Sequence, residues 1–125
     1  VLERRAIVET DDALRVEITL RTTVEGGRQG PLNLRDTHYP VLAACGTFAR
    51  WSDELDDAAD PKLFGIVLAQ GPPLVWPGES AVAVAFSPFF EPGTERLAQA
   101  GTFTLFEGRR IVGRGRVLGR LRDGA

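Results

Sequence analysis

Short stretches of alternating apolar and polar residues recur along this chain, and such alternation is typical of half-buried β-strands. In LRVEITLRTTV (14–24), every second residue from Leu14 to Leu20 is apolar and the residues between them are polar or charged. Further short apolar runs occupy 41–51, 62–70, 80–90, 101–108 and 110–121. Turn-forming residues separate the runs at intervals of about 8–12 residues, and no convincing amphipathic helix interrupts them. This spacing predicts six or seven strands in an all-β sandwich or barrel.

The run SAVAVAFSPFF (80–90) is apolar on both faces of the strand that it predicts. Valines and a phenylalanine alternate with alanines, so neither face carries the polar residues of a solvated surface. Such a strand is covered on both sides, or its outer face is left for a partner. We therefore expect a binding surface on an exposed barrel face beside this strand, or on the acidic loop at 52–61.

The last run, RIVGRGRVLGRL (110–121), combines glycines with arginines and has to be distinguished from a phosphate-binding loop and a nucleic-acid-binding arm. Glycines on an inner face suit a tightly curved barrel, in which neighbouring backbones approach closely. The run therefore predicts a strand with an outward arginine stripe. A period of two places Ile111, Gly113, Gly115, Val117, Gly119 and Leu121 on the inner face, and Val112, Arg114, Arg116, Leu118, Arg120 and Arg122 on the outer face.

Two nucleotide-binding motifs were compared with the glycine-rich stretch. A phosphate-binding P-loop needs a lysine directly after its last glycine, whereas Lys62 is the single lysine of the chain and lacks these glycines. A dinucleotide fingerprint needs a helix after its glycines, whereas strand periodicity continues here. We therefore expect no nucleotide site in this chain.

Length and charge limit the classes of protein further. The 125 residues match one domain, 1–125, in which 1–13 is expected to be an N-terminal extension or first edge strand and 49–62 an acidic loop insertion. The net charge of −2 argues against a globally basic nucleic-acid binder. No apolar run reaches the ~18 residues that span a bilayer, and a single cysteine fits a reducing compartment. We expect a soluble, cytoplasmic protein without membrane contact.

An ordered set of motifs resembles the C-terminal β-barrel domain, domain 3, of elongation factor Tu. In that family a strand runs into E-G-G-R, followed by M-V-M-P-G-D, a hydrophobic strand ending in H-P, and R-F-A-I-R-E-G-G-R-T-V-G-A-G. The counterparts here span about 14–121. They are Glu25-Gly26-Gly27-Arg28, Leu74-Val75-Trp76-Pro77-Gly78-Glu79, Ser87-Pro88, and Phe103 through Gly115.

The resemblance implies a six-stranded antiparallel closed β-barrel without catalytic activity. In the family this domain packs against a GTPase domain and helps to hold the T-stem of aminoacyl-tRNA and the exchange factor. The chain contains no GTPase domain, so GTP hydrolysis and tRNA delivery do not carry over. The family's His-Thr-Pro is Gln29-Gly30-Pro31 here, and its RNA-facing arginine before the second E-G-G-R is Phe106. Arg28, Gly108 and Arg110 match the family.

Two sets of side chains are candidates for binding a partner. The arginines form the first set, which contacts RNA phosphates or an acidic partner, or is simply a solvated strand face. The aromatic residues beside turns and the acidic loop form the second set, which either anchors a protein partner or packs in the core or rim. The first set is Arg28, Arg110, Arg114, Arg116, Arg120 and Arg122, and the second is Trp51, Trp76, Phe89 and Phe90.

No motif predicts catalysis, a metal or a cofactor. His38 lies near Asp36 without a nucleophile motif, and Cys45 is expected to be a buried, inert thiol. The acidic cluster within 52–60 lacks the glycine and final glutamate of a calcium-binding loop. The leading hypothesis is a non-catalytic β-barrel that binds a protein. The alternatives are a translation-associated RNA-binding module, which uses the arginines, and an enzyme of unrecognised type that depends on His38.

Overall fold

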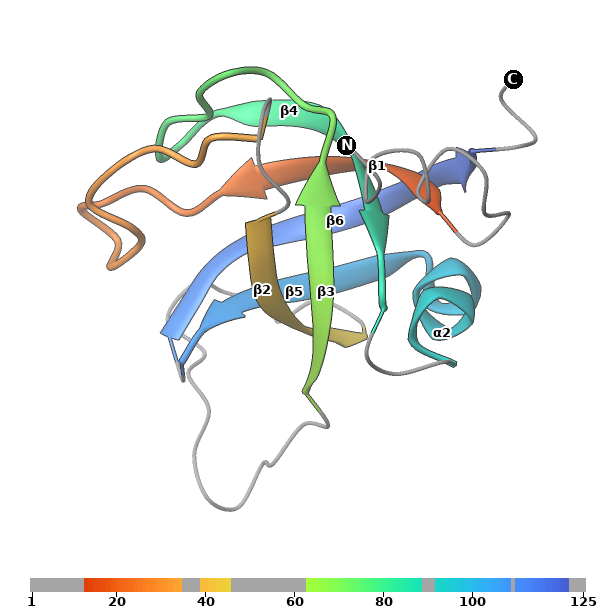
Figure 1. The fold of residues 1–125 in the computed structure, drawn as a ribbon. Helices are drawn as coiled ribbons and strands as arrows, with labels where there is room; N and C mark the ends of the chain where they lie inside the picture. The colour runs from red at the N-terminus through yellow and green to blue at the C-terminus, as the bar shows by residue number, and fades with distance from the viewer. Residues whose placement is uncertain (1–12, 35–38, 46–62, 89–91, 109, 122–125) are drawn as a thin grey trace, which may run out of the picture.

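The computed structural model describes residues 13–34, 39–45, 63–88, 92–108 and 110–121 (Figure 1). Six strands close an antiparallel barrel in the order β1-β4-β3-β2-β5-β6, and one short helix follows β4. The elements are β1 (Leu14–Leu20), β2 (Tyr39–Cys45), β3 (Phe64–Ala69), β4 (Ser80–Phe86), α2 (Gly93–Ala100), β5 (Thr102–Glu107) and β6 (Arg110–Arg120). The predicted all-β class and the six-stranded closed barrel are confirmed. Each predicted apolar run overlaps one strand, although β2 begins two residues before the run predicted at 41–51.

The main hydrophobic core fills the inside of the barrel. The alternation predicted for β1 is confirmed, because its apolar residues from Leu14 to Leu20 are all buried in this core. On β4 the alanines point inward, where Ala83 and Ala85 join the core. Val84 points outward and is buried in a second cluster with Ala13 and Ala69. The outer face of β4 is therefore covered in part by this chain itself.

Two inward glycines of β6 let the barrel close tightly. A Cβ atom at Gly115 would lie 2.1 Å from Cζ of Phe103, and one at Gly113 would lie 2.9 Å from the carbonyl oxygen of Thr19. Both positions are buried. The predicted role of inner glycines in close backbone approach is confirmed for Gly113, whereas Gly115 instead makes room for the Phe103 ring.

Two irregularities reverse the alternation at the ends of β6, where the predicted faces are wrong. The pairing skips Val112 between Leu105 and Phe106 of β5, so Val112 joins the barrel core and Ile111 packs outside it. The pairing skips a second residue opposite Arg15 and Val16 of β1. Each irregularity adds one residue to one strand, which moves every later side chain to the other face.

Beyond the second irregularity the assignments of three residues change. Arg120 pairs with the inward Leu14 of β1, so it leaves the predicted outer stripe. Gly119 pairs with the outward Arg15, and Leu121 packs in the outer cluster of Val84 rather than in the barrel.

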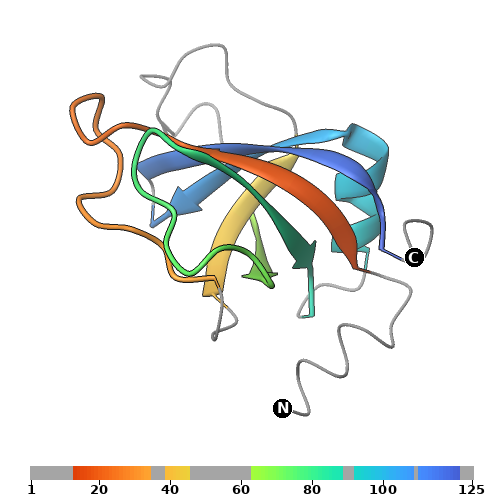
Figure 2. The same cartoon turned by 90° about the horizontal axis from the view of Figure 1, so that it is seen from above.

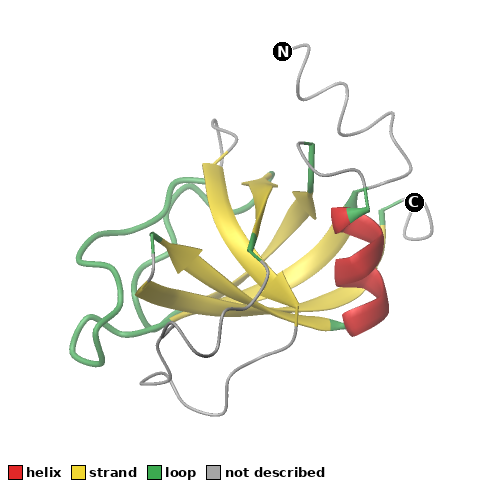
Figure 3. Cartoon of the chain, turned by 90° about the horizontal axis from the view of Figure 1, so that it is seen from below, coloured by secondary structure: helices red, strands yellow, loops and turns green. Residues whose placement is uncertain are grey.

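The helix α2 corrects the expectation that no amphipathic helix interrupts the strands. It begins after Pro92 and ends at Gly101, which adopts a left-handed conformation with φ of 80° and donates its backbone N–H to the carbonyl of Leu97. Leu97 is fully buried in the barrel core, so α2 closes one end of the barrel. Figures 2 and 3 show α2 at the end opposite the loops 21–34 and 70–79.

Candidate functional site at the loop end of the barrel

The loops 21–34 and 70–79 form one hydrogen-bonded unit, which we call the loop end. Leu32 and Val75 exchange two backbone hydrogen bonds of 2.9 and 2.8 Å, which join the two loops in the manner of a short β-bridge. The second loop is also fixed to β1, because the N–H of Gly78 donates to the carbonyl of Leu20 over 2.9 Å. The loop end is therefore held in place by backbone hydrogen bonds from both sides.

A tight turn at the loop end presents the side chain of Trp76. Gly78 has a φ of 90°, a conformation that glycine adopts without strain, and it follows Pro77 as in a type II turn. The N–H of Glu79 donates to the carbonyl of Trp76 over 2.9 Å, and Oε1 of Glu79 accepts from the N–H of Trp76 over 2.9 Å. The backbone of Trp76 is thus fixed on both its polar groups, while its side chain is 49% exposed.

Exposed apolar side chains gather on these two loops. Five large apolar side chains are exposed within the described residues, and three of them lie on the loop end: Val24, Leu74 and Trp76. The other two, Val82 and Leu118, lie on the outer surface of the strands β4 and β6. Because apolar side chains tend to be exposed singly, three of them on one bonded loop unit mark a candidate contact surface.

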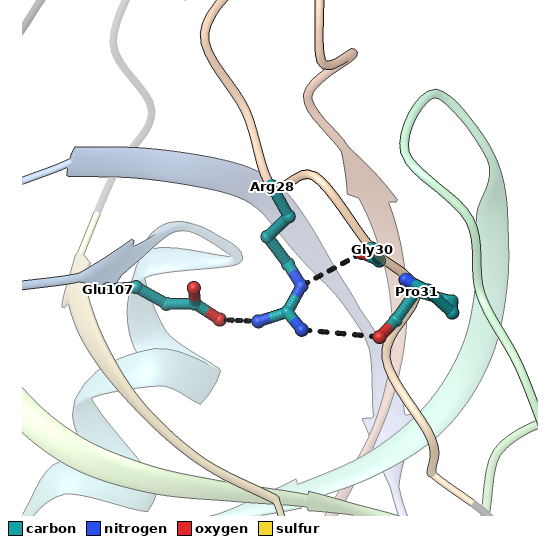
Figure 4. Close-up of polar contacts among 4 residues, drawn as sticks. All are labelled: Arg28, Gly30, Pro31 and Glu107. Atoms are coloured by element: carbon teal, nitrogen blue, oxygen red, sulfur yellow. Dashed lines mark hydrogen bonds and ion pairs between the residues drawn. The ribbon is translucent and has the colours of Figure 1, made fainter.

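Arg28, a candidate for RNA binding, makes its polar contacts with its own loop and with β5 (Figure 4). Its Nε donates to the carbonyl of Gly30 and its Nη2 to the carbonyl of Pro31, each over 3.2 Å, while Nη1 forms an ion pair with Glu107. Its side chain is 17% exposed. Arg28 therefore fastens the loop 21–34 to the end of β5.

The remaining arginine candidates do not form one continuous stripe. Arg116 lies on the outer face of β6, is 64% exposed and is paired with Glu17 over 2.8 Å. Arg114 lies on the same face of β6, two residues before Arg116 and opposite Thr19 of β1. Arg110 is exposed at the start of β6. Arg120 lies at the helix end, where its Nη2 reaches Glu95 of α2 over 2.5 Å. The second irregularity in β6 accounts for this separation.

Arg120 also borders a shallow cleft of about 290 Å³ between α2 and β6. The cleft is lined by Glu95, Ala98, Gln99, Val117, Gly119 and Arg120. Because Arg120 is ion-paired with Glu95 at this cleft, its charge is compensated within the chain.

Phe106 occupies the position at which the resemblance implies an RNA-facing arginine. Its side chain is fully buried in a small outer cluster with Ala44 and Ile111. An aromatic ring buried at this place leaves no phosphate-binding group there.

Sequence reasoning missed Arg21, which follows directly on β1. Its side chain is only 4% exposed, and its Nη1 donates to the carbonyl of Ile111 over 3.1 Å. Its Nε is buried without a hydrogen-bond partner. Alternation along β1 places Arg21 on the outer, polar face, so only the fold of the next loop reveals its burial.

Cys45 corrects a second expectation, because the structure exposes it at the end of β2. Partial burial nevertheless raises the pKa of the Cys45 thiol, and the nearby Arg96 guanidinium of α2 opposes this shift in part. A raised pKa keeps the thiol protonated and therefore weakly nucleophilic at neutral pH. The predicted burial is thus wrong, whereas the direction of the pKa shift agrees with an inert thiol.

Several sequence candidates lie outside the described residues. These are His38, Trp51, Phe89, Phe90, Arg122, the segment 1–12 and the acidic segment 49–62. Within the described ranges, no three His, Cys, Asp or Glu side chains are grouped so that they hold a metal ion. The one helix found there is too short to cross a bilayer.

Comparison with known proteins adds no family assignment. No protein-family model matches the chain, and no curated protein matches it significantly.

Proposed function

We propose that this chain is a non-catalytic protein-interaction module, related to domain 3 of elongation factor Tu, which binds its partner through the loop end. The observation that carries this proposal is the half-exposed Trp76 on a turn in which its own N–H and carbonyl are both hydrogen-bonded. A rigid side chain loses little conformational entropy on binding, and tryptophan is among the residues that most often dominate interface energies. The cytoplasm is the location that this proposal implies.

The distribution of charge favours a protein over RNA as the partner. RNA binding gains its affinity from cations that neutralise phosphates. In this structure Arg28 and Arg116 are paired with glutamates of the same chain, and Arg28 has little exposed surface. The outer face of β4, where the sequence suggested a partner, is covered in part by Ala13 and Leu121. Three of the five large apolar side chains exposed among the described residues lie on the loop end.

The test compares two exposed apolar side chains at different places on the barrel. Trp76→Ala removes the proposed anchor, and Leu118→Ala serves as a matched control because Leu118 is 45% exposed on β6. We expect Trp76→Ala to lose about 2 kcal/mol of binding, roughly 30-fold in Kd, toward a protein captured from a native lysate treated with RNase. Leu118→Ala should bind that protein as the wild type does. Equal losses in both variants, or disappearance of the partner after RNase treatment, would contradict the proposal.

RNA binding is retained as a second candidate because Arg116 is well exposed on the outer face of β6, with Arg114 two residues away. This candidate requires steeply salt-dependent affinity, which falls when both residues are changed to glutamate. Affinity for RNA that is unaffected by the double charge reversal would exclude this surface as the site.

A further inference from the structure

Arg21 is a buried cation that has no acidic partner within the described part of the chain. It lies between the end of β1 and the loop 22–27, with 4% of its surface exposed. By contrast, Arg28, Arg116 and Arg120 are each paired with a glutamate. Buried charges in proteins are ordinarily paired, because the loss of hydration is costly without a compensating partner. The isolation of Arg21 among the described residues therefore calls for an external partner.

One edge of the Arg21 guanidinium is left unused. Nη1 donates to the carbonyl of Ile111, whereas Nε is buried without an acceptor and Nη2 makes no hydrogen bond to the described residues. The N–H groups of Nε and Nη2 are parallel, and this edge of a guanidinium matches the two oxygens of a carboxylate. More than nine-tenths of buried polar groups have a partner, so a buried Nε without an acceptor is exceptional.

The surroundings of Arg21 select a planar monoanion over a phosphate. A phosphate is usually held by several backbone N–H groups in addition to a side chain. Two backbone donors of this loop are already engaged, since Gly26 donates to the carbonyl of Thr23 over 3.0 Å and Gly27 to that of Thr22 over 2.8 Å. The Arg21 edge itself offers two donors, which suffice for a carboxylate.

Gly26 keeps the loop close to this edge. A Cβ atom at Gly26 would lie 3.0 Å from Nη2 and 3.1 Å from Cζ of Arg21, and its φ of 106° already favours glycine. The loop thus lies against the guanidinium, and because Nε is buried an acceptor reaches the edge only when this loop is displaced. From this geometry we propose that the Nε–Nη2 edge of Arg21 is a binding site for a carboxylate group.

The site is tested by NMR titration of the intact chain. Sodium acetate is added at constant ionic strength, with sodium chloride as the reference, while the Nε–Hε signal of Arg21 and the amide signals of Gly26 and Gly27 are followed. We expect a saturable downfield shift of the Arg21 Hε, with no shift of the Arg116 Hε. Through-bond assignment of the Arg21 signal makes this measurement independent of any variant's folding.

Variants and a second anion sharpen the test. Arg21→Lys should weaken the acetate response of the two glycine amides about tenfold, because an ammonium has no two-donor edge, whereas Arg116→Lys should leave it unchanged. No saturable shift, or tighter binding of inorganic phosphate than of acetate, would overturn the proposal. In the structure Glu25 accepts a hydrogen bond from the Thr22 hydroxyl. If Glu25→Gln alone shifted the Arg21 Hε signal, Glu25 of the same loop would be the carboxylate at the edge, and the proposal would be overturned.

A blocked peptide with a single aspartate distinguishes the source of the carboxylate. Tighter binding of the peptide than of acetate assigns the site to an acidic side chain of a partner, and equal affinity assigns it to small organic acids. Both results support the carboxylate site. The inference does not rest on the proposed function, because Trp76→Ala should keep the acetate response whether or not it loses a protein partner.

Discussion

Gly115 of β6 lies directly against the ring of Phe103 of β5, which makes its replacement by alanine a sharp test of the barrel packing. The new Cβ would lie 2.1, 2.6 and 2.4 Å from the Cζ, Cε1 and Cε2 atoms of Phe103. Carbon atoms in contact are ordinarily about 3.5–4.0 Å apart, so the ring would have to withdraw by roughly 1.5 Å. Phe103 is fully buried in the main core, so this movement displaces further core side chains.

We expect Gly115→Ala to lower the free energy of unfolding by about 2–3 kcal/mol, near the upper end for overpacking a core. That is a large part of the roughly 5–15 kcal/mol that stabilises a domain of this kind. The control is Gly119→Ala in the same strand, where nothing lies within 4 Å of the new Cβ. This control should be neutral or stabilising by up to ~1 kcal/mol, because alanine restricts the unfolded chain more than glycine does.

The assay is urea unfolding with far-UV circular dichroism and tryptophan fluorescence as coincident probes. Phe103→Leu, alone and combined with Gly115→Ala, completes a double-mutant cycle. A smaller side chain at 103 should relieve the clash, giving a favourable coupling energy of about 1–3 kcal/mol. If Gly115→Ala were as stable as Gly119→Ala, or if the coupling energy were zero, the assignment of Gly115 to the barrel interior against Phe103 would be refuted.

Three further predictions concern the loop end and β2. Arg28→Met should lower stability by about 1–3 kcal/mol and speed proteolysis within 21–34 while the strand signal persists, because the ion pair to Glu107 and two hydrogen bonds to carbonyls are lost. Gly78→Ala should cost about 1 kcal/mol in urea unfolding, because φ is 90° there. Cys45 should react with iodoacetamide more slowly than a free thiol at pH 8, and its reaction rate should increase as the pH rises. Arg96→Gln should lower this rate further, because Arg96 lowers the pKa of the thiol.

The strands could be predicted because they are encoded by local alternation, whereas the closed barrel, rather than a sandwich, was expected only from the resemblance. β1 and β4 each alternate two kinds of side chain, and their faces follow from the period of two alone. The sequence does not say which apolar face of β4 is inside. The alanines of β4 occupy the interior and the valines lie outside, an arrangement that depends on large neighbours such as Phe103.

The faces of β6 could be predicted only in its middle. The irregularities at Val112 and beside Arg15 depend on the register with the neighbouring strands, which no local pattern reveals. The helix α2 was missed because its eight residues are fewer than the roughly 11 over which helical periodicity is read. Its ends were nevertheless marked, by Pro92 at the start and Gly101 at the close.

The candidate site depends even more on long-range pairing. Trp76 could be named from the sequence as a turn residue, but its rigid presentation follows from bonds to the distant Leu20 and Leu32 segments. Arg21 reads as an outward residue of a polar strand face, and only the fold of the loop over its guanidinium buries it.

The pairing of arginines with glutamates bears directly on the choice between the two proposed partners. An arginine that forms an ion pair within its chain must release the carboxylate before it can neutralise a phosphate, so it contributes less to RNA affinity than its charge suggests. Arg116 pays this cost toward Glu17, and Arg120 toward Glu95. The loop end differs, because it exposes three large apolar side chains and the Nε of its buried Arg21 has no acceptor. Exposed apolar side chains on the loop unit that also holds a buried cation match a protein segment with apolar and acidic side chains better than they match a phosphate backbone.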